Sequence, residues 1–174
     1  MVSVTISHVI GTVALIGLFI TAGMSYQIHF ANLREEAGAA QLQSIADYVS
    51  TAIMDVYSIG SSVRGDQLLF KTLEIPGQVA QSSYNISLIR VTTVSGEQTF
   101  SVLARLTWKP TVYAESELPF NGLDGLGLYN GTLPDGFEAT SVQPRTYVLG
   151  GVSTSVVWYD RASSSVTLGL GVKS

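Results

Sequence analysis

Histidines are the side chains that most often serve as metal ligands or acid-base catalysts near neutral pH, and this chain has two, His8 and His29. They are 21 residues apart in a segment without proline, so on one helix they would lie about 32 Å apart and could not share a site. They bracket an apolar run, which favours interfacial positions at its two ends. The alternative is a pH-sensitive contact between subunits.

Carboxylates come next as candidates for chemistry. Glu115 and Glu117 are two residues apart, and on a strand this spacing would suit either a glycosidase pair or charges that protect a sheet edge from aggregation. We favour the edge charges. Asp124, Asp135 and Glu138 offer oxygens that calcium could use, but the EF-hand spacing is absent. We therefore expect a solvated acidic loop.

Nucleophilic and phosphate-binding sites find no support in the sequence. A serine hydrolase needs a histidine beside its nucleophile, and both histidines lie in or beside the apolar run. Gly122, Gly125 and Gly127 lack the spacing of a dinucleotide-binding loop, and no Walker-type phosphate loop is present. The chain has no cysteine, which removes disulfides and thiol chemistry. We predict no enzyme activity, no catalytic residue, no cofactor and no metal site.

The charge distribution separates the chain into two parts. Of the 174 residues, 46% are hydrophobic and 13% are charged, with a net charge of −4. The nine Lys and Arg residues are scattered singly, so the sequence lacks the basic stripe that binds nucleic acid. No charged residue occurs before Arg34. The first 33 residues therefore face a different environment from the rest.

An apolar run from Val9 to Ile28 is about as long as the 20 residues with which a helix crosses a bilayer core. A cleaved signal peptide would begin with basic residues, and none precedes this run. Its three glycines, spaced by six residues, would let neighbouring helices approach closely at different levels. The residues that we predict to pack in a core of such helices are Val9, Ile10, Gly11, Val13, Ile16, Gly17, Phe19, Ile20 and Gly23.

The helix is expected to continue beyond the apolar run, because no proline occurs before Pro76. We predict one helix from about Ser3 to about Ser58. Its second half is amphipathic, with apolar residues at steps of three and four that should face a partner. These residues are Leu42, Ile45, Ala46, Val49, Ala52, Ile53, Val56, Ile59 and Val63.

Strand patterns follow from Tyr84 onward. Apolar residues alternate with polar ones from Phe100 to Trp108, which predicts a strand that buries one face, including Trp108. This strand should form a hairpin with residues 84–94 across a turn at 95–97. The other candidates are a hairpin of residues 152–159 and 166–172 and single strands at 68–75, 111–114 and 146–150.

About seven strands with turns between them predict an antiparallel Ig-like β-sandwich. The predicted fold class is therefore α+β, with a long N-terminal hydrophobic helix (1–60) followed by the β-sandwich (61–174). Residues 115–144 are rich in glycine and proline, so we expect an exposed interaction loop without structure of its own. Asn85 and Asn130 each begin an N-x-S/T sequon and are candidate N-glycosylation sites.

The order of these features resembles the type IV pilin-like proteins of archaea, a superfamily that includes adhesion pilins, archaellins and archaellum accessory subunits. Residues 7–30 resemble the assembly helix of that family. Residues 73–77 followed by 84–88 are similar to a strand-turn-strand pattern of such surface proteins. Bacterial pilins carry a glutamate at the fifth mature position, where this chain has Thr5, and the basic residue and glycine of a prepilin peptidase site do not precede the helix.

The resemblance implies a structural subunit of a surface filament, in which copies of this chain pack their helices in the core and place their β domains outside. The alternative is an archaellum accessory subunit of the stator type, whose single transmembrane helix would hold the β domain against a surface-layer or motor protein. Both interpretations imply the cell surface and a membrane that holds the helix before or instead of assembly. Adhesion or motility would be the role.

Overall fold

The computed structural model describes residues 2–92, 98–120, 126–132, 137, 140–152, 154–162 and 165–173, with side chains from residue 8 onward. The chain divides into two compact units, Met1–Ala37 and Gly38–Ser174, which we call the N-terminal and the C-terminal unit. Helix α1 (Val2–Ser62) supplies every described residue of the N-terminal unit and the first element of the C-terminal unit.

Helix α1 confirms the predicted long helix and extends it at both ends. Its last turn is closed by two serine side chains, since the hydroxyls of Ser61 and Ser62 donate to the carbonyls of Ser58 and Ile59 at 3.1 and 2.7 Å. Each of these bonds adds a side-chain donor to a carbonyl near the end of the helix. Gly65 then turns the chain with a φ of 105°, a conformation that glycine adopts readily.

The C-terminal unit adds nine strands within the described residues. Two long hairpins confirm the predicted ones, and their register is antiparallel throughout. The turn at 95–97 lies outside the described residues. The strands are β1 (Gln67–Thr72), β2 (Tyr84–Thr92), β3 (Gln98–Leu106), β4 (Tyr113–Leu118), β5 (Leu126–Leu128), β6 (Val142–Arg145), β7 (Tyr147–Leu149), β8 (Ser155–Ala162) and β9 (Ser165–Lys173).

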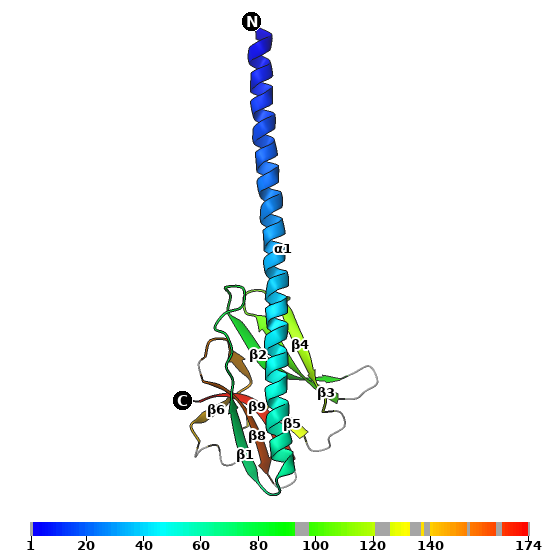
Figure 1. The fold of residues 1–174 in the computed structure, drawn as a ribbon, viewed down its shortest axis with the longest axis vertical. Coiled ribbons are helices and arrows are strands. Elements are labelled where there is room, and N and C mark those ends of the chain that lie inside the picture. The colour runs from blue at the N-terminus through cyan, green and yellow to red at the C-terminus, as the bar shows by residue number, and fades with distance from the viewer. Residues whose placement is uncertain are drawn as a thin grey trace. The chain divides into compact units, whose positions relative to one another are not determined.

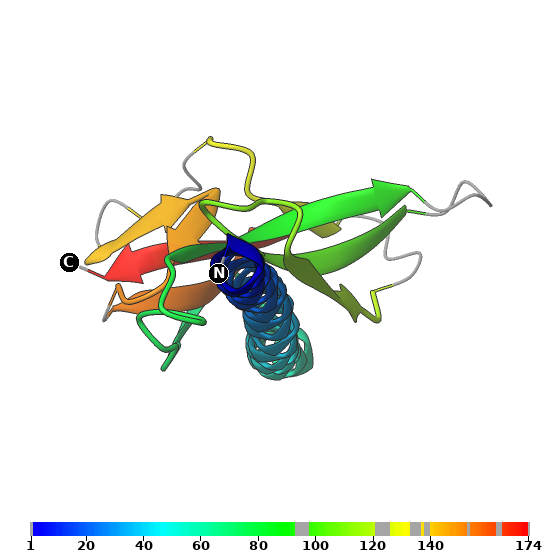
Figure 2. The same cartoon turned by 90° about the horizontal axis from the view of Figure 1, so that it is seen from above.

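The strands form two sheets (Figure 1). One has the order β1-β8-β9-β5, with β6 also paired to β9, and the other has the order β4-β3-β2-β7. All pairs are antiparallel except β5 with β9. Only Thr146 separates β6 from β7, so the chain passes directly from one sheet into the other. In Figure 2 the orange and red strands of the first sheet and the green strands of the second extend to opposite sides.

The core of the C-terminal unit lies between its part of α1 and both sheets. The amphipathic stripe predicted from the sequence is buried from Leu42 to Val56 and shares one hydrophobic cluster with strand residues such as Ile86, Val102 and Leu168. Ile59 and Val63 are exceptions, because both are exposed. The partner that the stripe faces is thus the chain's own β-sheets. The predicted fold class, α+β with a long helix followed by antiparallel sheets, is confirmed.

The expectation of a structureless loop over residues 115–144 is wrong in three places. Strands β4, β5 and β6 all fall within or overlap this segment. The segment also covers the first sheet, since Phe137 is buried against Trp158 with ring centroids 4.8 Å apart, and Tyr129 packs on the same indole at 5.6 Å. Aromatic burial therefore fixes parts of a glycine-rich segment. The predicted division into 1–60 and 61–174 stays a prediction.

Candidate functional site: the apolar segment of helix α1

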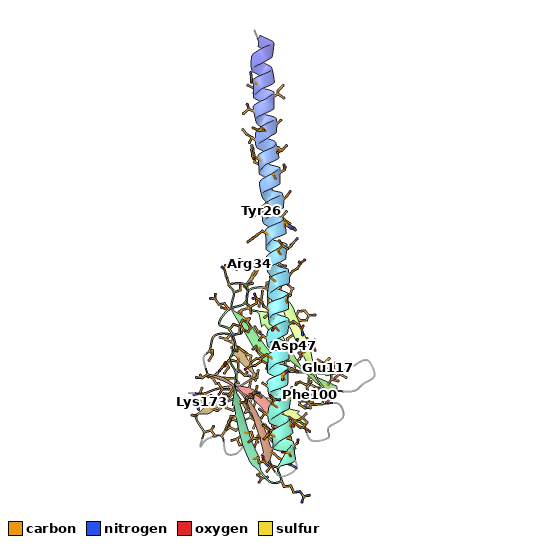
Figure 3. The ribbon with its side chains drawn as sticks, viewed as in Figure 1. Tyr26, Arg34, Asp47, Phe100, Glu117 and Lys173 are labelled. Carbon is orange, nitrogen blue, oxygen red and sulfur yellow. The ribbon has the colours of Figure 1, made fainter. Side chains whose placement is uncertain are left out.

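The apolar segment, residues 8–33 of α1, leaves its large side chains uncovered. Each exposes between 50% and 70% of its surface. Figure 3 shows side chains that project to both sides of the helix above the label of Tyr26. Exposed apolar surface of this extent marks a contact with protein or lipid. The thirteen residues are Val9, Ile10, Val13, Leu15, Ile16, Leu18, Phe19, Ile20, Met24, Tyr26, Ile28, Phe30 and Leu33.

Three glycines interrupt this surface at different faces. A Cβ added at Gly11, Gly17 or Gly23 would meet no atom within 4 Å, so the chain itself does not require glycine at any of them. Six residues of helix turn through about 240° and rise about 9 Å. At each glycine no side chain covers the helix backbone, which leaves a notch in the helix surface. The three notches therefore face directions about 120° apart at three levels.

The two threonine hydroxyls of the apolar segment are satisfied within the helix. Thr12 donates to the carbonyl of His8 at 2.9 Å, and Thr21 donates to the carbonyls of Gly17 and Leu18 at 3.1 and 3.0 Å. A hydroxyl that already has a partner loses little when water is removed. The segment can therefore enter an apolar environment without leaving these donors unpaired.

The length and composition of α1 meet the requirement for a membrane-spanning helix. His8 begins the segment, and His29 lies one turn before its end, so the structure does not bring the two histidines together. Arg34 is the first charged residue and comes directly after Leu33. The nine residues predicted for helix packing all lie on this segment, and the six of them with large side chains are among the thirteen exposed ones. That they pack against copies of this chain stays a prediction.

The other candidates for chemistry remain apart. Glu115 and Glu117 are exposed on β4, which is an edge strand, as expected for charges that protect a sheet edge. Asp124, Asp135 and Glu138 lie outside the described residues. Within the described part of the chain, no three His, Asp or Glu side chains are grouped as metal ligands would be.

The two sequons occupy different environments. Asn85 lies in β2 between two paired strands, and its Oδ1 accepts a hydrogen bond from Nε of Arg105 at 3.2 Å. Asn130 is exposed, and its Oδ1 accepts a hydrogen bond from the backbone N–H of Thr132 at 3.1 Å. Gly131 between them has a φ of 103°. Asn130 is therefore the more accessible acceptor.

A groove of about 480 Å³ lies within the C-terminal unit, between α1 and residues 74–79. Its walls are tied together by backbone donors, since the N–H of Glu74 donates to the Tyr48 hydroxyl at 3.2 Å and the N–H of Ala80 donates to Oε1 of Gln41 at 3.1 Å. Beside it, the Tyr84 hydroxyl donates to the carbonyl of Pro76 at 2.6 Å, and burial raises the pKa of Tyr84 to about 12. Glu74 is the one carboxylate among the described lining residues.

The interpretation of Trp108 as a buried strand residue is wrong. Strand β3 ends at Leu106, and Trp108 lies beyond it in the turn to β4 with 60% of its side chain exposed. Pro110, two residues later, was the signal that the strand does not continue, since proline cannot donate to a sheet.

Comparisons with models of protein families, with characterised proteins and with solved structures find no match to this chain.

Proposed function

We propose that this chain is a structural subunit of a surface filament of the archaeal type IV pilin-like kind. Residues from about 2 to 31 pack with copies of themselves in the filament core, and the C-terminal units form the outer layer. A membrane holds the apolar segment before assembly. The observation that carries this proposal is an apolar segment whose large side chains are left exposed by the part of the chain that the structure describes.

The free energy available from covering the segment is large. Full burial of one such side chain contributes roughly 1.5 to 3 kcal/mol. The thirteen residues expose about half to two thirds of their surface. Covering this exposed part supplies about 10 to 25 kcal/mol. A bilayer or a bundle of helices would supply it equally well, so energy alone does not choose between them.

The glycines favour a bundle. Glycine costs about 1 kcal/mol relative to alanine inside a helix, and lipid chains gain nothing from it. In a bundle the same residue lets two backbones approach closely. Notches at Gly11, Gly17 and Gly23 that face three directions suit a helix with neighbours on three sides rather than a single partner.

The second candidate is a single-pass anchor whose C-terminal unit binds a surface-layer or motor protein. The outer face of the sheet β4-β3-β2-β7 favours it, because Tyr113, Tyr147 and Leu149 are exposed there. Aromatic residues on an open sheet face are typical of protein interfaces.

Deletion of residues 1–32 tests the filament proposal. The hydrophobic core of the C-terminal unit begins at Leu42, so this unit retains its core after the deletion. We expect the full chain to form ordered filaments, seen by electron microscopy of negatively stained preparations, and the shortened chain to sediment as a monomer and to remain in the supernatant of a membrane flotation. Ordered filaments from the shortened chain would show that the helix is not the assembly element.

A further inference from the structure

An exposed tryptophan lies in the turn between β3 and β4. Trp108 exposes 60% of its side chain, although its turn has an ordered backbone. The N–H of Leu106 donates to the carbonyl of Val112 at 3.1 Å, and the N–H of Val112 donates to the carbonyl of Lys109 at 2.9 Å. Such a turn presents the indole from a fixed backbone, and an exposed tryptophan on a fixed backbone suits a binding surface.

This turn is located where α1 enters the C-terminal unit. A Cβ at Gly38, the first residue of that unit, would lie 4.0 Å from Cδ1 of Leu106 and 3.5 Å from Cβ of Ala80. The turn at residues 79–83 lies beside the first turn, because the N–H of Thr107 donates to the carbonyl of Ser83 at 3.0 Å. The two turns together form the end of the C-terminal unit at Gly38.

The covalent chain keeps this end near the apolar segment. Leu33 closes that segment, and Gly38 follows five residues later. As helix these five residues rise about 7.5 Å, and even fully extended they reach no more than about 17 Å. The headgroup layer outside a bilayer core is roughly 5 to 8 Å thick on each side. When the apolar segment occupies the bilayer, the two turns are therefore held at or near the headgroups.

The chemistry of the two turns suits that layer. Residues 79–83 and 107–112 contain no carboxylate and a single charge, that of Lys109. Tryptophan concentrates at the level of the headgroups, where its ring meets apolar groups and its N–H meets polar ones. A lysine beside it is attracted to anionic lipids.

We propose that Trp108 inserts among the lipid headgroups next to the apolar segment and holds the C-terminal unit on the membrane surface. This inference rests on the part of the proposed function that places the apolar segment in a membrane. It gives the exposed indole a ligand, the lipid surface, that acts before or without filament assembly.

The two tryptophans of the chain make the test direct. Trp158 is fully buried, so the difference in fluorescence between the unchanged chain and its Trp108→Phe variant reports on Trp108. The full chain is reconstituted in vesicles of phosphatidylcholine and phosphatidylglycerol. The matched control is Trp108→Phe combined with Ile59→Trp, because Ile59 is 58% exposed and lies 21 residues, about 32 Å of helix, beyond Gly38.

We expect a lipid with a nitroxide on its headgroup to quench the Trp108 signal at least threefold more than the signal of the control. Aqueous iodide should quench the Trp108 signal at least threefold less than the signal of the control. A chain that floats with the vesicles but whose Trp108 signal is as open to iodide as the control overturns this inference alone. Protection from iodide without quenching by the labelled lipid also overturns it, because a second copy of the chain would then cover the indole. A chain that does not float overturns the membrane part of the proposed function together with the inference.

Discussion

Gly17→Leu distinguishes a helix packed among copies of itself from a helix surrounded by lipid. A Cβ at Gly17 meets no atom of the described residues within 4 Å, so we expect the isolated subunit to accommodate leucine without strain. Replacing glycine by leucine also favours the helix by somewhat less than 1 kcal/mol. The change should therefore leave folding and membrane insertion intact.

Filament assembly, unlike folding and membrane insertion, should be weakened by Gly17→Leu. Filling a close contact between packed helices costs about 1 to 3 kcal/mol, and every subunit of a filament would carry that cost. If adding one subunit becomes less favourable by this 1 to 3 kcal/mol, the critical concentration for assembly rises about 5- to 150-fold. We expect few or short filaments at concentrations at which the unchanged protein assembles completely.

The assay combines membrane flotation, which measures insertion, with sedimentation and electron microscopy, which measure assembly. Gly17→Ala adds one methyl group and should have a smaller effect. Leu18→Ile preserves the volume of the neighbouring side chain and should change the critical concentration less than Gly17→Leu does, since volume-conserving changes cost less than overpacking. Filaments of normal number and length from Gly17→Leu would refute the packed-core reasoning and favour the single anchor.

Three further outcomes concern the C-terminal unit. Gly60→Ala should lower the free energy of unfolding, measured by chemical denaturation, by about 1 to 3 kcal/mol, because the new methyl would overlap the buried ring of Tyr159. The control is Gly38→Ala, which should not destabilise the protein, because a Cβ at Gly38 meets only ordinary contacts. Burial raises the pKa of Tyr84 from 10.0 to about 12, so its contribution to stability is complete below pH 10 and is lost as the pH rises toward 12; Tyr84→Phe should reduce the fall in Tm over that interval. Where cells N-glycosylate the protein, peptide mass spectrometry should find the glycan at Asn130 and not at the sequon in β2, and the reverse occupancy would contradict the accessibility argument.

The sequence predicted the elements that short-range patterns of apolar and polar residues define. Helix α1 and the two long hairpins follow from periods of 3.6 and 2 and from the turns between them. Strand β5 could not be predicted, because three residues that pair in parallel with β9 leave no pattern of their own. Strand β6 contains Pro144, which favours a loop, although the strand pairs with β9. The burial of Phe137 likewise depends on Trp158, a residue far away in the sequence.

The helix that carries the candidate site was predicted more completely than the strands, and the reason is physical. Among the described residues, the large side chains of this segment are left exposed, so its pattern does not depend on long-range contacts that sequence reasoning could miss. The absence of charge before Arg34 and the apolar residues on all faces are both properties of the sequence alone.

Trp108 illustrates the opposite case. Its alternation with Leu106 and Ala104 indicated burial, but exposure depends on where β3 ends and on which turn follows. The position of that turn also depends on the fold. Leu106 and Ala80 lie close to Gly38, the first residue of the C-terminal unit, and this places the turn where α1 enters that unit. The apolar segment thus needs a partner outside the chain by its composition, whereas Trp108 acquires its proposed place at the membrane surface from the fold. The second proposal can therefore fail without the first, because an inserted chain with a water-exposed Trp108 leaves the first intact and removes the second.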